Sequence, residues 1–187
     1  MANIFTTKSG KEVVIRSIEN AESDVRAAME FINKIIKEDA MVTRFGNPVT
    51  LEEEKEWAEK TTKKIQEGDQ IFLAAFVNNE MVGSAQITRQ KERSKHVGTF
   101  GISIAKKIRG QGLGKELMRQ VLEKAPEINI SHIELHVYEG NKPAIQLYAS
   151  MDFKEVGRLP EAIQYRGKLI TDIIMWKKLN SSSANDK

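Results

Sequence analysis

A turn with three glycines in six residues, followed directly by an amphipathic helix, constrains this chain more than any other stretch. The turn is residues 109–114 (RGQGLG), and residues 102–105 before it have the pattern of a strand end. Glycines permit positive φ angles and a close approach of the backbone to a ligand. The first N–H groups of a helix have no partner within it, and the helix dipole favours negative charge there. This arrangement therefore predicts a phosphate or pyrophosphate site.

The helix after the turn is predicted by its 3.6-residue periodicity. Its apolar residues share one face: Leu113, Leu117, Met118, Val121, Leu122 and Ala125. Charged residues fill the opposite face, as expected of a helix packed on a sheet. Arg109 and Lys115 flank the turn and add full positive charges to the predicted anion site.

Two common phosphate-binding patterns do not fit the turn. The dinucleotide fingerprint fails because Lys115 stands where its last glycine belongs. The P-loop pattern fails because Arg109 replaces its first glycine and Glu116 its hydroxyl residue. The remaining pattern, Arg-x-x-Gly-x-Gly, resembles the acyl-coenzyme A pyrophosphate loop of the GNAT superfamily of N-acetyltransferases. The alternative interpretation is a tight turn whose glycines serve only packing.

Length and composition limit the classes of protein that remain. The 187 residues suffice for one domain with a substantial core, and we expect residues 1–179 to form it. No long apolar run or signal peptide is apparent, so no membrane partner is expected. The net charge is only +3 and basic residues alternate with acidic ones, which argues against nucleic-acid binding. The absence of cysteine excludes disulfides and thiolate metal sites and fits a cytoplasmic protein.

Apolar patterning predicts the order of elements along the chain. Strands are expected at residues 12–18, 70–77, 80–89, 96–105, 131–139 and 152–158 and within 163–179. Helices are expected at residues 20–38, 50–67, 113–125 and 141–151, and a disordered tail at residues 180–187.

Local signals mark several of the predicted boundaries. Asn20 or Ser23 is the expected N-cap of the first helix. Thr50 and Glu53 form a predicted capping box at the start of the second. The pair at residues 78–79 (NN) predicts a hairpin turn.

A second motif strengthens the resemblance to the GNAT superfamily. Residues 141–153 read Asn-x-x-Ala-x-x-Leu-Tyr-x-x-x-x-Phe, which is similar to the family's Asn-x-x-Ala-x-x-Leu-Tyr-x-x-x-Gly-Phe. Asp152 replaces the glycine of this motif, and Ala105 and Lys106 replace an Asp-Pro pair common after the preceding strand. The resemblance covers residues 12–179. It implies an α+β, three-layer GNAT-type fold, with a mixed, mostly antiparallel, splayed sheet of the seven expected strands between helices.

The resemblance also implies an enzyme and its chemistry. The family transfers an acetyl group from acetyl-CoA to a primary amine, by direct attack in a ternary complex and without a metal. A protein or peptide N-terminus, a ribosomal protein and a small amino-acid-like amine are all compatible acceptors. The alternative is a non-catalytic acyl-CoA-binding or sensing module on the same fold. The oligomeric state stays open, with a homodimer as one option.

The same resemblance assigns the cofactor contacts. The pantetheine is expected to lie between two splayed strands, residues 96–105 and 131–139, with the backbone amide of Ile104 as oxyanion donor. The expected contacts are Ile102, Ser103, Ile104, Arg109, Gly110, Gln111, Gly112, Leu113, Gly114, Lys115, Asn141 and Tyr148.

Tyr148 is the expected general acid, because a phenol with a pKa of about 10 can protonate a departing thiolate. Plain core packing is the alternative role of this side chain, and Tyr138 is a second candidate acid. The general base is left undetermined, either water or one of four side chains: His96, Glu139, Glu80 and His136.

Acceptor specificity is expected from the first helix pair with its connecting loop, residues 39–49, and from the segment before the last strand, residues 159–167. The first contains Arg44 and Phe45 and the second Tyr165.

Overall fold

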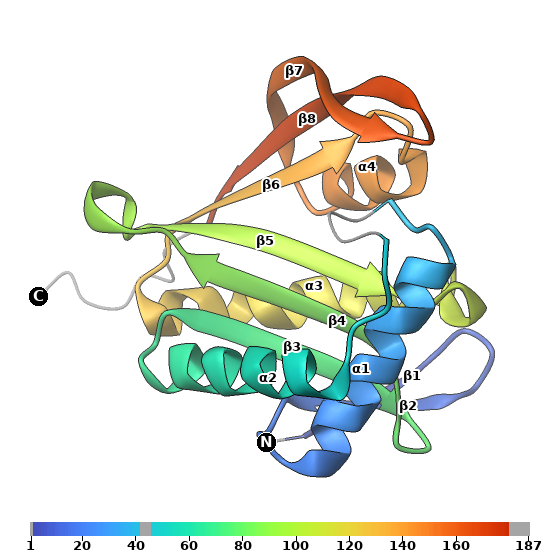
Figure 1. Cartoon of the computed structure of the whole chain (residues 1–187). Coiled ribbons are helices and arrows are strands. Elements are labelled where there is room, and N and C mark those ends of the chain that lie inside the picture. The colour runs from blue at the N-terminus through green and yellow to red at the C-terminus, as the bar shows by residue number, and fades with distance from the viewer. Residues whose placement is uncertain (1, 42–45, 180–187) are drawn as a thin grey trace, which may run out of the picture.

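The structure, a computed structural model, describes residues 2–41 and 46–179. This part of the chain folds around a single eight-stranded sheet in the order β1-β2-β3-β4-β5-β6-β8-β7 (Figure 1). All neighbouring strands pair antiparallel except β5 and β6, which pair parallel. The expected α+β class with a mostly antiparallel sheet is confirmed. Among the described helices, none has the length and apolarity needed to cross a membrane.

The strands are β1 (Asn3–Thr6), β2 (Glu12–Ser17), β3 (Gln70–Val77), β4 (Glu80–Arg89), β5 (Val97–Ile104), β6 (His132–Tyr138), β7 (Lys154–Tyr165) and β8 (Lys168–Lys178). The helices are α1 (Glu22–Lys37), α2 (Leu51–Gln66), α3 (Leu113–Lys124) and α4 (Lys142–Ala149). Three short 3₁₀ helices are η1 (Glu92–Ser94), η2 (Lys106–Ile108) and η3 (Ala125–Ile128).

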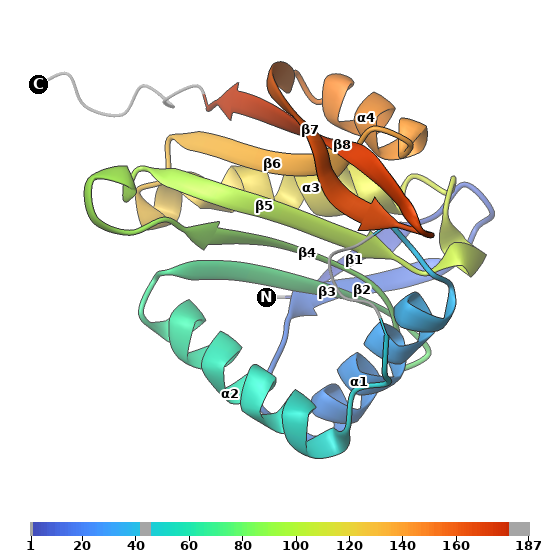
Figure 2. The same cartoon turned by 45° about the horizontal axis from the view of Figure 1, so that its top comes forward.

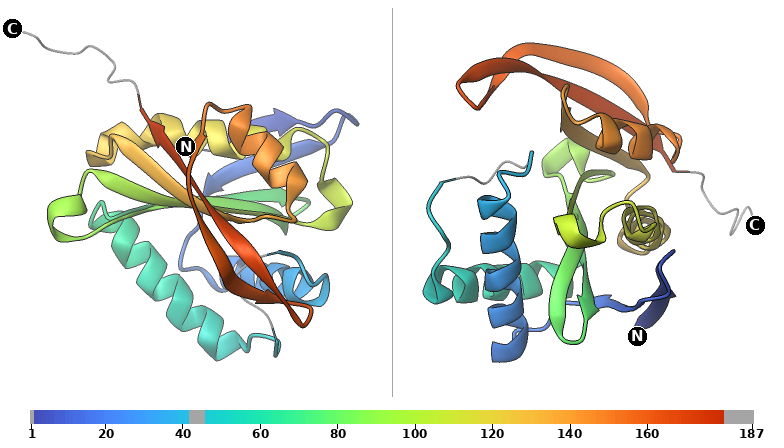
Figure 3. Two further views of the ribbon diagram at one scale, coloured as in Figure 1. Left: turned by 90° about the horizontal axis from the view of Figure 1, so that it is seen from above. Right: turned by 90° about the vertical axis from the view of Figure 1, so that its right-hand side faces the viewer.

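The helices form two layers on opposite faces of the sheet. Figures 2 and 3 show α1 and α2 on one face and α3 on the other. The apolar run of β3 explains this arrangement, because its successive side chains are buried on both faces. Leu73 and Ala75 join the core under α3, whereas Phe72 and Phe76 join the core under α1 and α2.

The start of α1 differs from the prediction. Neither Asn20 nor Ser23 caps it; Ala21 is the N-cap and makes no side-chain cap hydrogen bond. The side chain of Asp24, in the first turn, instead accepts two hydrogen bonds of 2.6 Å from Arg16 on β2. This ion pair joins the helix start to the sheet. By contrast, the capping box of α2 is present as predicted.

The sheet has one strand more than expected, and its last hairpin is longer. The short strand β1 was not predicted, and residues 159–165, expected as a loop, are the end of β7. An irregularity in the pairing between Leu159 and Ile163 accommodates Pro160 and Glu161, the residues that suggested a loop. Proline is tolerated here because β7 is an edge strand. The two remaining residues of the segment, 166–167, form the turn to β8.

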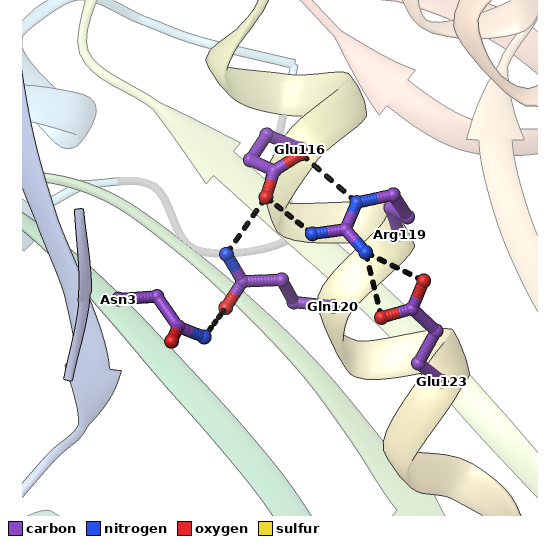
Figure 4. Close-up of polar contacts among 5 residues, drawn as sticks. All are labelled: Asn3, Glu116, Arg119, Gln120 and Glu123. Atoms are coloured by element: carbon purple, nitrogen blue, oxygen red, sulfur yellow. Dashed lines mark hydrogen bonds and ion pairs between the residues drawn. The ribbon is translucent and has the colours of Figure 1, made fainter. Parts of the chain in front are cut away.

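Side-chain hydrogen bonds attach β1 to α3 (Figure 4). The Nδ2 atom of Asn3 donates to Oε1 of Gln120 at 3.0 Å, and Nε2 of Gln120 donates to Glu116 at 2.8 Å. The Arg119 guanidinium donates to Glu116 and to Glu123 along the exposed face of α3. Because Gln120 is buried, its amide oxygen depends on Asn3.

We expect Asn3→Ala to lower the free energy of unfolding by about 1 kcal/mol, because it removes the partner of a buried amide oxygen. Urea unfolding monitored by circular dichroism measures this change. Ile4→Ala on the same strand is the matched control: Ile4 is 70% exposed, so its truncation should cost less than about 0.5 kcal/mol. Equal losses in the two variants would contradict the role of the Asn3–Gln120 bond.

Candidate active site

The central feature of the site is a gap in the sheet between β5 and β6. The two strands pair only at three positions, Val97–Thr99 with His132–Glu134. Beyond Thr99, β5 continues to Ile104 without this partner, and β6 continues to Tyr138. Figure 1 shows the two strands moving apart toward the end at which α4 lies. One edge of each strand is therefore open, as expected for a splayed sheet.

The pairing of β4 with β5 determines which backbone groups face the gap. Gln90 N donates to Val97 O, and Ala105 N donates to Val82 O, each at 2.9 Å. In an antiparallel ladder such bonded pairs recur at every second residue, so the backbone groups of Ser103 point to β4. Those of Ile102 and Ile104 point the opposite way, into the gap. Of the three predicted pantetheine contacts, Ile102 and Ile104 thus have the suitable backbone orientation.

The glycine turn leads from β5 and η2 into α3. Gly110 and Gly112 have φ angles of 75° and 89°, in the left-handed region that favours glycine. Gly112 is the N-cap of α3, and no side chain caps this helix end. A Cβ at Gly110 would have no heavy atom within 4 Å. The turn therefore leaves open space beside uncapped helix N–H groups, which suits an anion such as pyrophosphate.

The side chains in and beside the glycine turn make different contacts. Lys115 is exposed and makes no ion pair within the described part of the chain, so its charge is available to a ligand. Arg109 instead connects two elements: its Nε donates to Ile104 O at 2.8 Å, and its Nη2 to Glu38 at the end of α1 at 2.6 Å. Leu113 is buried in the core, so only its backbone N–H can face an anion.

Gln111 lies against the turn that joins β1 and β2. Its backbone oxygen accepts a hydrogen bond from Lys8 N at 3.3 Å. Its side-chain Oε1 is buried and finds no hydrogen-bond partner among the described residues. Phe5 packs nearby, since a Cβ at Gly112 would lie 3.5 Å from the Phe5 ring. The unpredicted strand β1 thus supports the glycine turn from behind.

A cavity of about 1230 Å³ passes from the glycine turn through the gap to the opposite face of the sheet. On the α3 side it is lined by Gly110, Gly112, Gly114, Lys115, Leu147 and Tyr148. On the side of α1 and α2 it is lined by Phe31, Trp57, Ser84, Gln86, His136 and Asp172. One continuous cavity therefore connects the predicted anion site with a second compartment on the side of α1 and α2.

Tyr148 lies on α4 and reaches this cavity. Its ring is 6% exposed and packs edge-on against Phe100, with 6.0 Å between ring centroids. No group in the described part of the chain hydrogen-bonds its hydroxyl. Burial raises the pKa of Tyr148 to about 12, so the phenol keeps its proton at neutral pH. Both predicted aspects of this residue, core packing and a proton to donate, are compatible with this position.

Asn141 is the N-cap of α4 and lines the same cavity. Its Oδ1 accepts from Ala144 N at 3.4 Å, and its backbone N donates to Tyr138 O at 2.8 Å. Asn141 therefore holds α4, and with it Tyr148, beside the end of β6. Asp152, which replaces the motif glycine, has a φ of 64°, so the turn forms with aspartate in the left-handed conformation.

The four side chains considered as the base are placed very differently. His96 is exposed beside η1 and does not line the cavity. Glu139 is paired with Arg158 at 2.9 Å, and Glu80 with Lys34 and Lys107; neither carboxylate lines the cavity. His136 does line the cavity.

The two segments expected to select the acceptor meet at the cavity. Tyr165 Oη donates to Asp39 O at 2.9 Å, and Arg166 Nε donates to Asp39 Oδ2 at 2.5 Å. The hairpin β7–β8 is thereby joined to the end of α1. Arg44 and Phe45 fall outside the described residues.

Two cavity residues were missed by sequence reasoning. Trp57 on α2 and Asp172 on β8 both line the cavity. The position of Trp57 on the buried side of a predicted helix could have suggested it. Asp172 carries a stronger signal, because a carboxylate that interrupts the apolar run of a core strand is costly to bury unless it is paired.

Comparisons with known proteins agree with this geometry. The sequence model described as Acetyltransferase (GNAT) family matches residues 33–153, well over half of the chain. The Bacillus subtilis protein named "Putative phosphinothricin acetyltransferase YwnH" is 27% identical over 162 residues, covering 84% of this chain and 94% of the relative. The L-amino acid N-acetyltransferase AaaT of Escherichia coli is 32% identical over 87 residues, covering 46% of this chain and 54% of the relative.

A solved structure shows the same fold. YncA from Salmonella typhimurium, whose structure contains its cofactor acetyl-CoA, superimposes with a TM-score of 0.77. The match covers 93% of this chain and 98% of that protein at 19% sequence identity.

Proposed function

Because the chain belongs to the GNAT family of acetyltransferases, we propose that it transfers the acetyl group of acetyl-CoA to the primary amine of a small amino-acid-like molecule. We place the activity in residues 1–179 as a single domain, since all described strands belong to one sheet.

One observation carries this proposal: a single cavity contains the glycine turn, the gap between β5 and β6, and the buried phenol of Tyr148. The turn and Lys115 supply an anion site suited to the pyrophosphate of acetyl-CoA. The gap has open strand edges that suit the amide groups of pantetheine. These features occur in the order in which pyrophosphate, pantetheine and thioester follow one another along acetyl-CoA.

The residues then have separate roles in the reaction. The backbone N–H of Ile104, which points into the gap, would donate to the carbonyl oxygen of the thioester and stabilise the charge that develops there. The amine nitrogen forms a bond to the carbonyl carbon, and the carbon–sulfur bond breaks. Tyr148 would give its phenolic proton to the departing thiolate. Asn141 would hold α4 so that this phenol stays at the gap.

The names of two relatives support a small-molecule acceptor. YwnH is named for phosphinothricin and AaaT for L-amino acids, and both names describe small molecules with an amino-acid amine. The compartment next to α1 and α2 has polar groups from Ser84 and Gln86 and an aromatic wall from Trp57. These features suit a compact polar amine, which we therefore favour over a protein N-terminus.

The test is release of CoA from acetyl-CoA, detected by a thiol reagent, against a panel of amines. The panel holds L-phosphinothricin, the proteinogenic L-amino acids, polyamines, aminoglycosides and short peptides with free N-termini. We expect turnover with L-phosphinothricin or an L-amino acid, confirmed by the mass of the N-acetyl product. Acetyl-CoA binding without turnover on any amine would instead indicate an acyl-CoA-sensing module.

A further inference from the structure

We infer that His136, held in place by Asp172, is the base that takes the proton from the acceptor amine. This inference rests on the proposed acetyl transfer and assigns a residue to the one proton-transfer step that has none. It is carried by the position of His136 at the gap and by its contact with a buried carboxylate.

His136 lies on β6 just past the point where β5 and β6 separate. The last paired position is Thr99 with Glu134, so continuing the register places His136 across the gap from Gly101. Leu135 and Val137 belong to the core under α3, so the side chain of His136 projects to the opposite face, toward α1 and α2. Gly101 has no side chain, and the side chain of Gln86, which also lines the cavity, borders the position that a Cβ there would take. The ring therefore faces the acceptor compartment beside the position proposed for the thioester.

The orientation of the imidazole is fixed by Asp172 on β8. His136 Nδ1 lies 2.6 Å from Asp172 Oδ2, and the Asp172 side chain is only 9% exposed. A buried carboxylate accepts the Nδ1 proton and so leaves Nε2 with a free lone pair, which is the form that a base requires. No described residue hydrogen-bonds Nε2; Oε1 of Glu134 lies 3.6 Å from it, beyond hydrogen-bond distance.

The second carboxylate oxygen of Asp172 makes no hydrogen bond to the described residues. Its Oδ1 is buried, lacks a hydrogen-bond partner in the described part of the chain, and belongs to a residue that lines the cavity. Buried acceptors are normally paired, because an unpaired one has lost its hydrogen bonds to water. Among the described residues, the imidazole of His136 is thus the one hydrogen-bond partner of this carboxylate.

The charges around the ring favour the protonated product of this step. Asp172 on β8 and Glu134 on β6 lie beside the imidazole, while Asp39, Glu53 and Glu54 line the cavity beyond it. Carboxylates close to the ring stabilise the positive charge that it gains. One amine proton goes to Nε2, the nitrogen–carbon bond forms, the carbon–sulfur bond breaks, and the thiolate takes the proton of Tyr148. His136 then releases its proton to water, and the Tyr148 phenolate regains a proton from water, which restores both residues.

The variant His136→Asn tests this role. Asparagine keeps a nitrogen donor for Asp172 but lacks the Nε2 atom. With L-phosphinothricin and the L-amino acids of the panel, we expect kcat to fall by about 10²-fold with the KM for acetyl-CoA unchanged. The pH profile of kcat should differ between the wild type and this variant, because the variant lacks the group that takes the amine proton.

His132→Asn is the matched control, because His132 lies on the same strand four residues earlier but does not line the cavity. It should keep both the wild-type kcat and its pH profile. A second variant, Asp172→Asn, should lower kcat while leaving the KM for acetyl-CoA unchanged. Unaltered binding of acetyl-CoA in each variant shows that the fold is retained.

A measurement on the wild type makes the test independent of how the variants fold. The chain has three histidines, so long-range ¹H–¹⁵N spectra can resolve their tautomers. We expect the Nδ1–H tautomer for His136. The Nε2–H tautomer, or wild-type kcat and pH profile in His136→Asn, would overturn the inference while leaving the acetyltransferase proposal intact. A wild type without turnover on the panel would overturn both.

Discussion

Tyr148→Phe should lower kcat by about 10²-fold or more and leave the affinity for acetyl-CoA nearly unchanged. The substitution keeps the ring that packs against Phe100 and removes only the hydroxyl, which no described residue hydrogen-bonds. The packing of α4 should therefore survive, and the lost step is protonation of the leaving thiolate. Steady-state kinetics with the best amine of the panel, together with calorimetric titration of acetyl-CoA, separates turnover from binding.

The pH dependence of the wild type gives a second check on Tyr148. An ordinary tyrosine loses its proton near pH 10, but burial raises the pKa of Tyr148 to about 12. The acid form should therefore persist, and turnover should show no decline caused by tyrosine ionisation up to about pH 10. Tyr138→Phe tests the other candidate. A large loss in Tyr138→Phe with none in Tyr148→Phe would return Tyr148 to a purely structural role.

Gly112→Val should weaken acetyl-CoA binding at least about tenfold, which corresponds to about 1.4 kcal/mol. Gly112 is the N-cap of α3 with a φ of 89°, a conformation that a β-branched residue strongly disfavours. A Cβ there would lie 3.5 Å from the Phe5 ring, so the larger valine side chain should also displace the turn from the position in which it presents the helix N–H groups. Calorimetric titration with acetyl-CoA and with CoA measures the loss.

Backbone strain alone must be separated from lost binding. Gly68→Val provides this control, because Gly68 also has a positive φ, 73°, and lies outside the cavity. A Cβ at Gly68 would lie 3.8 Å from the Ile128 side chain, and a Cβ at Gly112 would lie 3.5 Å from the Phe5 ring. Both distances are ordinary van der Waals contacts, so the two sites are sterically comparable. Both variants should lose some stability, by about 1–2 kcal/mol, but only Gly112→Val should lose acetyl-CoA affinity. Full affinity in a folded Gly112→Val would remove the turn from the binding site.

Features that depend on local sequence were predicted well. The runs that became β3 and β4 were bounded correctly because continuous apolar patterning and a hairpin signal adjoin one another there, and the start of α2 is marked by its own capping box. The helix after the glycine turn was predicted from its local apolar periodicity, and every residue of that apolar stripe is buried in the structure. These signals act over one or two turns of chain, which is the range that periodicity can describe.

Features that depend on distant partners were not predicted. The four-residue β1 carries too little pattern to stand out, and besides its pairing with β2 it is attached through Gln120, far along the chain. Arg109 was expected to serve the anion site, but its guanidinium pairs with Glu38, 71 residues away in sequence. The contact between His136 and Asp172 likewise joins residues 36 positions apart. Such pairings follow from the order of strands in the sheet, which no local pattern specifies.

The gap between β5 and β6 has a consequence for the thermodynamics of the protein. Beyond their three paired positions, the facing backbone groups of β5 and β6 do not hydrogen-bond to each other. In the proposed complex, the amide groups of pantetheine form hydrogen bonds with them instead. The sheet would then be complete only while its co-substrate is present. Each cycle would remove and restore one line of its hydrogen bonds. The fraction of molecules with a fully hydrogen-bonded sheet would thus rise and fall with the cellular concentration of acetyl-CoA. The rigidity of the protein would therefore depend on the metabolite that it consumes.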